Sequence, residues 1–222
     1  MTTSRSKQRV PWALYGFVIG VAIVLAVVDL GGGITDQGLQ LLTRHTARFS
    51  FALFLVVFVA SSAASLTHWP AARMLVRRRR HLGLAFALAH FIHLGALTSF
   101  FVLTPAEPDA IAIVGGGFGY VLLAALAITS NDAMMRRLGR NWKRLHTFGV
   151  YYLWFIFAQS YVGRVFASDS EANVVASPKF VYVVLLSLAM LALAARLARR
   201  FQKRLRVRKK GPTREHEPMP TQ

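Results

Sequence analysis

Hydrophobic residues along this chain gather into six long runs, and short polar or basic segments separate the runs. A helix that crosses the hydrocarbon core of a bilayer needs about 20 mainly apolar residues. The runs therefore predict transmembrane helices at residues 11–30, 47–66, 81–103, 111–129, 145–165 and 180–197. The predicted fold class is an all-α membrane protein, a six-transmembrane-helix bundle within residues 11–200, with an N-terminal tail at 1–10 and a basic, partly disordered tail at 201–222.

Two features of these runs have alternative interpretations. The first run has a basic flank, as a signal peptide does, but its apolar stretch is long and no A-x-A-type cleavage site follows it, which favours a retained helix. The glycine-rich stretch at 115–119 lies inside an apolar run with no soluble strand before it. This position favours close helix packing over a nucleotide-binding loop.

The composition supports the membrane interpretation and excludes several kinds of chemistry. Hydrophobic residues make up 55% of the chain, and its net charge is +18. The basic residues flank apolar runs rather than forming stripes on a folded surface, so we expect no nucleic acid partner. Cysteine is absent. The chain therefore forms no disulfide, no cysteine-ligated iron–sulfur cluster and no covalent c-type haem attachment, so any haem is held non-covalently.

The charge distribution predicts the orientation in the bilayer, because cytoplasmic loops carry an excess of Lys and Arg. The N-terminal tail, segments 67–80 and 130–144, and the tail from residue 196 hold 23 basic and 3 acidic residues. The connections on the opposite side hold 4 basic and 6 acidic residues. We therefore expect both termini to be cytoplasmic. The stretch at 196–210 is interpreted either as an anchor on anionic lipid headgroups or as a docking site for an acidic soluble partner.

Three histidines lie in otherwise apolar, membrane-length runs: His90 and His93 in the third and His146 at the start of the fifth. An ionisable side chain inside a bilayer is unfavourable, and its presence there indicates a proton path, a metal or a cofactor. Neutral imidazole is also a common axial ligand of haem iron. For His90, a hydrogen bond to a backbone carbonyl of a neighbouring helix is the main alternative interpretation.

Counting from the basic inner flanks places polar side chains at two depths. His93 lies 13 residues past Arg80 and Gln159 lies 15 past Arg144, heights that agree within about 3 Å. His146 lies near the inner surface. Thirteen residues rise about 20 Å, a spacing that suits two stacked haems. Thirteen steps of about 100° place His146 and Gln159 well apart around an ideal helix, however, so they share a face only if the helix bends.

Two motifs carry a resemblance to a known family. An arginine-rich loop precedes Leu-Gly-Leu, and a histidine follows nine residues after the second leucine, here Leu84 and His93. The fifth run opens with a Trp-basic-basic-Leu-His motif at residues 142–146. The chain resembles, over roughly residues 40–200, the ferric reductase-like transmembrane domain superfamily. It is most similar to the haem b membrane subunits of bacterial periplasmic methionine sulfoxide reductase systems.

The resemblance implies a multi-pass protein of the bacterial inner membrane that contains one or two haem b groups and transfers electrons. It implies a separate cytoplasmic flavin reductase or membrane quinol as the donor, a periplasmic reductase as the acceptor, and FMN or quinone as further candidate cofactors. His93 and His146 are the best candidate ligands of the haem iron. Arg80 and Arg144 are candidate partners of haem propionates or a flavin phosphate, with positive-inside anchoring as the alternative.

One position departs from the family pattern. Members commonly carry a second histidine 13 residues after the Leu-His histidine, and here that position is Gln159. We hypothesise that His90 compensates, either as an additional ligand or by pairing with His146 across a single tilted haem. Two rival functions stay open: a haem-free scaffold or small-solute or proton pathway, and a haem protein with a sensory or assembly role.

Overall fold

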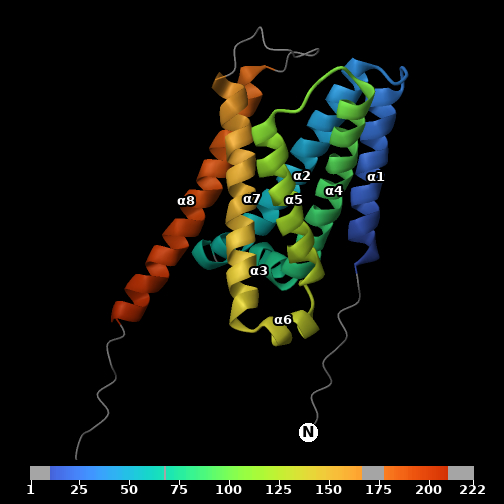
Figure 1. Cartoon of the computed structure of the whole chain (residues 1–222). Helices are drawn as coiled ribbons and strands as arrows, with labels where there is room; N and C mark the ends of the chain where they lie inside the picture. Colours follow the sequence, from blue (N-terminus) through green and yellow to red (C-terminus); the bar gives the residue numbers. More distant parts are fainter. Residues whose placement is uncertain (1–10, 68, 167–177, 210–222) are drawn as a thin grey trace, which may run out of the picture.

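A computed structural model describes residues 11–67, 69–166 and 178–209, and these residues form eight helices and no strand. The predicted tail at 1–10 and the disorder expected after residue 211 lie outside the described residues. Figure 1 shows the longer helices side by side as one bundle. The helices are α1 (Trp12–Leu30), α2 (Asp36–Leu66), α3 (Pro70–Arg77), α4 (Arg79–Leu103), α5 (Ala110–Ile128), α6 (Asp132–Leu138), α7 (Arg140–Phe166) and α8 (Lys179–Lys209).

Several of these helices are long and apolar enough to cross a membrane, which indicates a multi-pass membrane protein. Within the described residues α1, α2, α4 and α8 meet this requirement alone, and α5 with α6 adds a fifth span bent by 105°. Helix α7 has 27 residues, but His146, Gln159 and its basic first turn lower its hydropathy. The structure thus has four or five candidate spans where six were expected.

Both basic loops contain a short helix that the hydropathy pattern did not predict. Helix α3 begins with Pro70, which is favourable in a first turn because its missing N–H would have no helical partner there. Helix α6 is capped by Asn131, whose side-chain oxygen accepts from the amide of Met134 at 2.8 Å. It ends at Gly139, which has a φ of 51°. Each loop is therefore a surface helix rather than an irregular connection.

Helices α2 and α8 differ from their predicted lengths. Helix α2 begins at Asp36, earlier than the predicted residue 47, because the hydroxyl of Thr35 accepts from the amide of Gly38 at 3.1 Å and caps it. Helix α8 continues to Lys209, beyond the predicted end of the span at 197. The residues after 197 include Ala, Leu, Arg and Lys, which have high helix propensity. The predicted basic tail is thus helical over its first part.

Helix α2 is central and packs against α1, α3, α4 and α8, whereas α7 packs against α5 and α8. Phe51, Phe54 and Phe58 of α2 are buried and, at helical spacing, share one face. Phe54 contacts Phe86 of α4 and Phe157 of α7, with ring centroids 5.3 and 5.2 Å apart. These five side chains, called here the phenylalanine cluster, fill the middle of the bundle.

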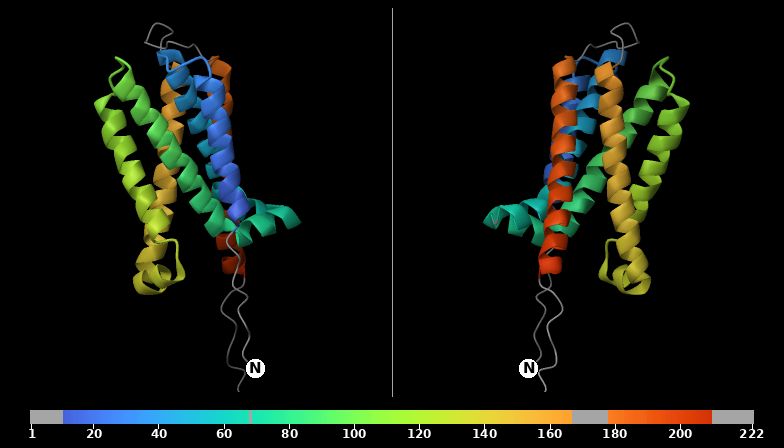
Figure 2. Two further views of the ribbon diagram at one scale, coloured as in Figure 1. Left: turned by 90° about the vertical axis from the view of Figure 1, so that its right-hand side faces the viewer. Right: turned by 90° about the vertical axis from the view of Figure 1, so that its left-hand side faces the viewer.

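The helices alternate in direction, so the basic segments gather at one end. Helices α3 and α6 and the C-terminal part of α8 lie toward the lower end in Figure 1, and the views in Figure 2 agree. The connections from α1 to α2 and from α4 to α5 lie at the opposite end. We call the lower end the basic end. The grouping is the one that the charge pattern predicted.

Glycines in α5 allow α7 to approach closely, as the sequence indicated. A Cβ on Gly119 would lie 3.6 Å from the ring of Tyr152, an ordinary contact distance. The Tyr152 hydroxyl donates to the carbonyl of Gly115 at 3.0 Å. The prediction of helix packing for the glycine-rich stretch is therefore confirmed at these two positions.

Candidate functional site

His90 and His93 lie together in the bundle, and each is bonded to a hydroxyl of α2. The Nδ1 atom of His90 is 3.0 Å from the Ser50 hydroxyl oxygen, and Nδ1 of His93 is 3.1 Å from that of Thr46. Ser50 is fully buried and His90 is 8% exposed. The two imidazole centroids are 5.4 Å apart. The expected alternative for His90, a bond to a neighbouring helix, is therefore present, through a side chain rather than a carbonyl.

Each of these hydroxyls also bonds a carbonyl of its own helix. The Thr46 hydroxyl donates to the carbonyl of Leu42 at 2.7 Å, and the Ser50 hydroxyl donates to that of Ala47 at 2.9 Å. A hydroxyl that donates to its carbonyl accepts from the imidazole, and in that arrangement Nδ1 carries the proton and Nε2 keeps its lone pair. Metal-binding histidines are usually held this way, with one N–H donated to a neighbouring group.

Aromatic side chains enclose the His90 ring. Tyr120 of α5 stacks on it with a centroid distance of 4.8 Å and an interplanar angle of 20°. Phe86 and Phe157 of the phenylalanine cluster lie 5.5 and 5.3 Å away. The His90 ring is therefore held by aromatic contacts from α4, α5 and α7.

His146 is held at the basic end by two neighbours. Its ring stacks on Trp142 with a centroid distance of 4.1 Å and an angle of 28°. Its Nε2 is 3.0 Å from the Thr129 hydroxyl oxygen, which itself donates to the carbonyl of Ala125 at 2.6 Å. When the Thr129 hydroxyl donates to that carbonyl, it accepts from Nε2 of His146. Trp142 also donates from Nε1 to the carbonyl of Thr129 at 2.9 Å, which fixes the indole.

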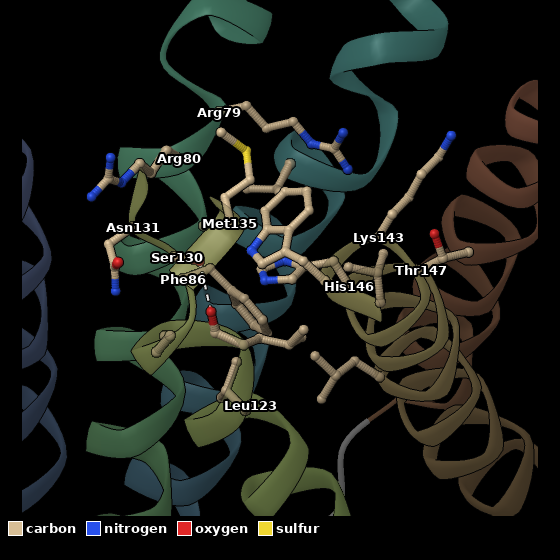
Figure 3. A pocket seen from close by; sticks show the side chains of 18 of the residues that line it. Arg79, Arg80, Phe86, Leu123, Ser130, Asn131, Met135, Lys143, His146 and Thr147 are labelled. Carbon is tan, nitrogen blue, oxygen red and sulfur yellow. Dashed lines mark hydrogen bonds between the residues drawn. The ribbon is translucent and has the colours of Figure 1, made fainter. Parts of the chain in front are cut away.

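A cavity of about 550 Å³ opens beside His146 at the basic end (Figure 3). This volume is within the range of small-molecule sites, about 300–1,000 Å³. Its inner part is apolar, with Phe54 and Phe86 of the phenylalanine cluster and Leu123 and Leu153 in its wall. Its outer part carries four cationic side chains, from Arg79, Arg80, Lys143 and Arg196. The cavity therefore suits an apolar ligand that ends in negative charge.

Two of these cations already have partners. Arg80 lies 3.3 Å from a carboxylate oxygen of Asp132, and both side chains are largely exposed. Arg196 donates to the carbonyl of Phe58 at 3.2 Å and lies over the Phe58 ring, 4.4 Å from its centroid. The lining therefore contains one acidic and four cationic side chains, and this excess of positive charge favours an anionic ligand.

The structure brings together only part of the predicted site. Of the predicted residues, His146 and Arg80 line the cavity, whereas His90 and His93 lie outside the lining, with the His90 ring next to the phenylalanine cluster. Gln159 is exposed on α7, and Arg144 is exposed beyond the lining. The expectation that His146 and Gln159 point to different sides of an ideal helix is therefore confirmed.

The arrangement does not favour pairing of His90 with His146 across one haem. The His90 ring contacts Phe157 of α7, which is 11 residues beyond His146. Eleven residues rise about 16 Å, whereas two axial ligands must reach the same iron atom. Phe86 and Phe157 also stand between the His90 level and the cavity.

The lining combines an apolar inner wall with a cationic mouth, and a porphyrin has a flat apolar body with carboxylate side chains at one edge. His146 adds an imidazole to this lining, with its Nε2 bonded to Thr129. In the described ranges no three His, Asp or Glu side chains converge as a closed metal site requires.

Several residues of the site were not singled out from the sequence. Thr43, Thr46 and Ser50 lie at helical spacing at the start of α2, just before and within the predicted apolar run, and form a polar stripe on one helix face. The Thr43 hydroxyl, which donates to the carbonyl of Leu39 at 2.9 Å, also lies 3.3 Å from the carbonyl of Ala96 on α4, so this stripe faces the helix of the histidines. Arg196 had no such signal, because the fold brings it to the cavity from a distant part of the chain.

No protein-family model matches this chain, and no solved structure matches it. The family resemblance therefore rests on the two sequence motifs alone.

Proposed function

We propose that the chain is a haem b-containing electron-transfer protein that spans the bacterial inner membrane. The observation that carries this proposal is the cavity beside His146, in which an apolar wall, a held imidazole and an excess of cationic side chains adjoin one another. His93, which lies beside His90 in the same bundle with Nδ1 bonded to Thr46, supports it further.

The side chains have distinct parts in this proposal. His146 and His93 are the candidate iron ligands, with His90 as a neighbour of His93. Arg79, Lys143 and Arg196 neutralise propionate groups at the cavity mouth, and Arg80 adds to them. Haem supplies a one-electron redox centre whose potential depends on its axial ligands and on how dry its site is. The phenylalanine cluster keeps water out of the region between the two levels.

The proposed topology has six spans with both termini in the cytoplasm. Helix α7 counts as a span because it lies alongside the other long helices (Figure 1) and its 27 residues extend about 40 Å. The basic end would then face the cytoplasm, where a flavin reductase or a membrane quinol delivers electrons, and the acceptor would be a periplasmic reductase.

The orientation has a direct test, because the chain contains no cysteine. Arg137→Cys places a thiol on α6 at the basic end, and Glu107→Cys places one in the connection at the opposite end. In intact spheroplasts an impermeant thiol reagent should label the Glu107 variant and not the Arg137 variant. Labelling of Arg137 alone would reverse the proposed orientation.

An absorption spectrum tests the haem directly. Protein purified after haem-replete expression should show a Soret band and, when reduced, b-type α and β bands. His146→Ala should lose haem, whereas His81→Ala should keep it, because His81 lies outside the cavity lining and contacts Tyr15. A folded protein without a Soret band would refute the proposal. Haem that dithionite reduces, but neither flavin reductase nor quinol does, would indicate a sensory role instead.

A haem-free proton or small-solute pathway is the second candidate. The observation in its favour is that Ser50 and Thr46 satisfy the Nδ1 atoms of both buried histidines without any iron. The exposure of Gln159 also removes the second family ligand from the bundle interior. Proton flux in haem-free proteoliposomes that falls in His90→Phe and not in His81→Ala would support this function.

A further inference from the structure

Three arginines gather toward the end of the bundle opposite the basic end. Arg44 and Arg48 lie one turn apart on α2, and Arg164 lies in the last turn of α7. They are three of the four basic residues that the charge pattern assigns to this side. The positive-inside rule accounts for the cations of the basic end and not for these. Their convergence therefore needs another cause.

Tyr182 of α8 links the arginines of the two other helices. The centroid of its ring lies 5.7 Å from the guanidinium carbon of Arg48 and 5.6 Å from that of Arg164. Both distances are within the range of about 6 Å for a cation–π contact. Arg48 and Arg164 also act electrostatically on Arg44, which is only 6% exposed. Three positive charges therefore share one small, partly buried region.

Tyr161 of α7 brings a hydroxyl to the same region. The residue is 5% exposed, and its hydroxyl is buried without a hydrogen-bond partner among the described residues. Its ring packs on that of Phe51, with centroids 4.9 Å apart, which fixes the side chain. Arg48, Arg164 and Tyr182 act electrostatically on this hydroxyl. A buried donor without an acceptor is unfavourable and is rare in native proteins, so it indicates a missing partner.

Phosphate matches the chemistry of this region. A guanidinium presents its N–H groups in a planar fork that fits two phosphate oxygens, and a phenol hydroxyl can donate to a further oxygen. Several guanidinium groups are favourable together in a partly buried region only when negative charge or acceptors accompany them. Asp29, the acid at the end of α1, bonds His45 at 2.9 Å rather than an arginine.

We propose that this region binds a phosphate group through three guanidinium groups and one hydroxyl, those of Arg44, Arg48, Arg164 and Tyr161. Tyr182 positions two of the guanidinium groups. The phosphate is either inorganic phosphate or the headgroup of an anionic phospholipid, and it enters on the side of Arg164, which is exposed. The site is separate from the cavity at the basic end, and it does not depend on haem.

Titration of the whole chain with inorganic phosphate tests the proposal. Calorimetry in an uncharged detergent at constant ionic strength should show saturable binding. Arg164→Gln should weaken it about tenfold, because it removes a charge-assisted contact. Tyr161→Phe, which keeps the ring against Phe51, should weaken it about threefold. Arg137→Gln on α6 and Tyr152→Phe on α7 are the matched controls and should leave binding unchanged.

A second measurement distinguishes the two sources of phosphate. Native mass spectrometry records phosphatidylglycerol that stays bound when this lipid is added to the same micelles. Saturable binding of inorganic phosphate supports a site for the free ion. Bound phosphatidylglycerol that is lost in Arg164→Gln and kept in Arg137→Gln, without binding of inorganic phosphate, supports a site for a lipid headgroup.

Three outcomes would overturn the proposal. The first is no binding in either measurement. The second is equal weakening by Arg164→Gln and Arg137→Gln, which would show a general effect of charge. The third is loss of the Soret band in Arg164→Gln with phosphate binding unchanged, which would assign the arginine to a haem propionate. A folded protein that has no Soret band and still binds phosphate would refute the proposed function and support this site.

Discussion

Removing the Ser50 hydroxyl should destabilise the bundle through His90 rather than through lost packing. Ser50 is fully buried, and Ser50→Ala removes one oxygen and leaves Nδ1 of His90 without its hydrogen-bond partner. A buried donor without a partner costs about 1–3 kcal/mol in soluble proteins. Double-mutant cycles in a membrane protein average about 0.6 and reach about 1.7 kcal/mol for such bonds. We therefore expect a coupling energy of about 0.6–1.7 kcal/mol between Ser50 and His90.

A double-mutant cycle measures that energy. The four proteins are the unmodified chain, Ser50→Ala, His90→Phe and the variant with both changes. His90→Phe removes the N–H and keeps an aromatic ring next to Tyr120. The free energy of unfolding is measured by denaturing each protein with sodium dodecyl sulfate in mixed micelles. Once His90 is Phe, Ser50→Ala should have little further effect, because no donor is left unsatisfied.

Ser99→Ala is the matched control. The Ser99 hydroxyl donates to the carbonyl of Gly95 in its own helix at 2.9 Å and is exposed. Its removal should change the free energy of unfolding by less than about 0.5 kcal/mol. A Ser50–His90 coupling below about 0.3 kcal/mol is additivity within error and would refute a stabilising hydrogen bond between the two side chains.

Three further substitutions test the packing and charge of the bundle. Gly149→Leu should destabilise it by about 1–3 kcal/mol, because a Cβ there already lies 2.9 Å from Leu126, and Leu126→Ala in the same chain should restore part of the loss in a thermal unfolding assay. Asp132→Asn should change unfolding by less than about 1 kcal/mol, because its pair with Arg80 is largely exposed. Arg196→Met should raise the proteolysis rate of α8, since its guanidinium lies over the ring of Phe58 and bonds the Phe58 carbonyl, contacts that tie α8 to α2.

The long helices were predictable because the thickness of a bilayer sets the length of a spanning helix, and apolar runs of that length can be recognised in the sequence. The short helices in the basic loops were missed, although their signals were present. Pro70 is the first residue of α3, and Asn131 and Gly139 flank α6 at the cap positions where these residues are favoured. A search for membrane spans averages hydropathy over about 20 residues, so it does not detect a helix of seven or eight residues.

The buried histidines were predictable as polar residues in apolar runs, but their partners were not. Whether an imidazole faces a hydroxyl, a carbonyl or a cavity depends on the rotation of α4 against α2, and no single helix encodes that rotation. The same limit applied to Arg196, which reaches the cavity only because α8 packs against α2 and α7. The sequence did predict that His146 and Gln159 lie on different sides of α7, because helical geometry within one element determines their angular separation.

The hydroxyl bonds suggest how this bundle holds its histidines in place. In each case a Ser or Thr bonds both a carbonyl of its own helix and the ring, so the backbone of α2 or α5 sets the orientation of an imidazole on α4 or α7. These contacts lie entirely within the protein. A ligand that binds at such a side chain loses little free energy to ordering it. If the proposed function holds, variants that remove haem binding therefore need not unfold the bundle.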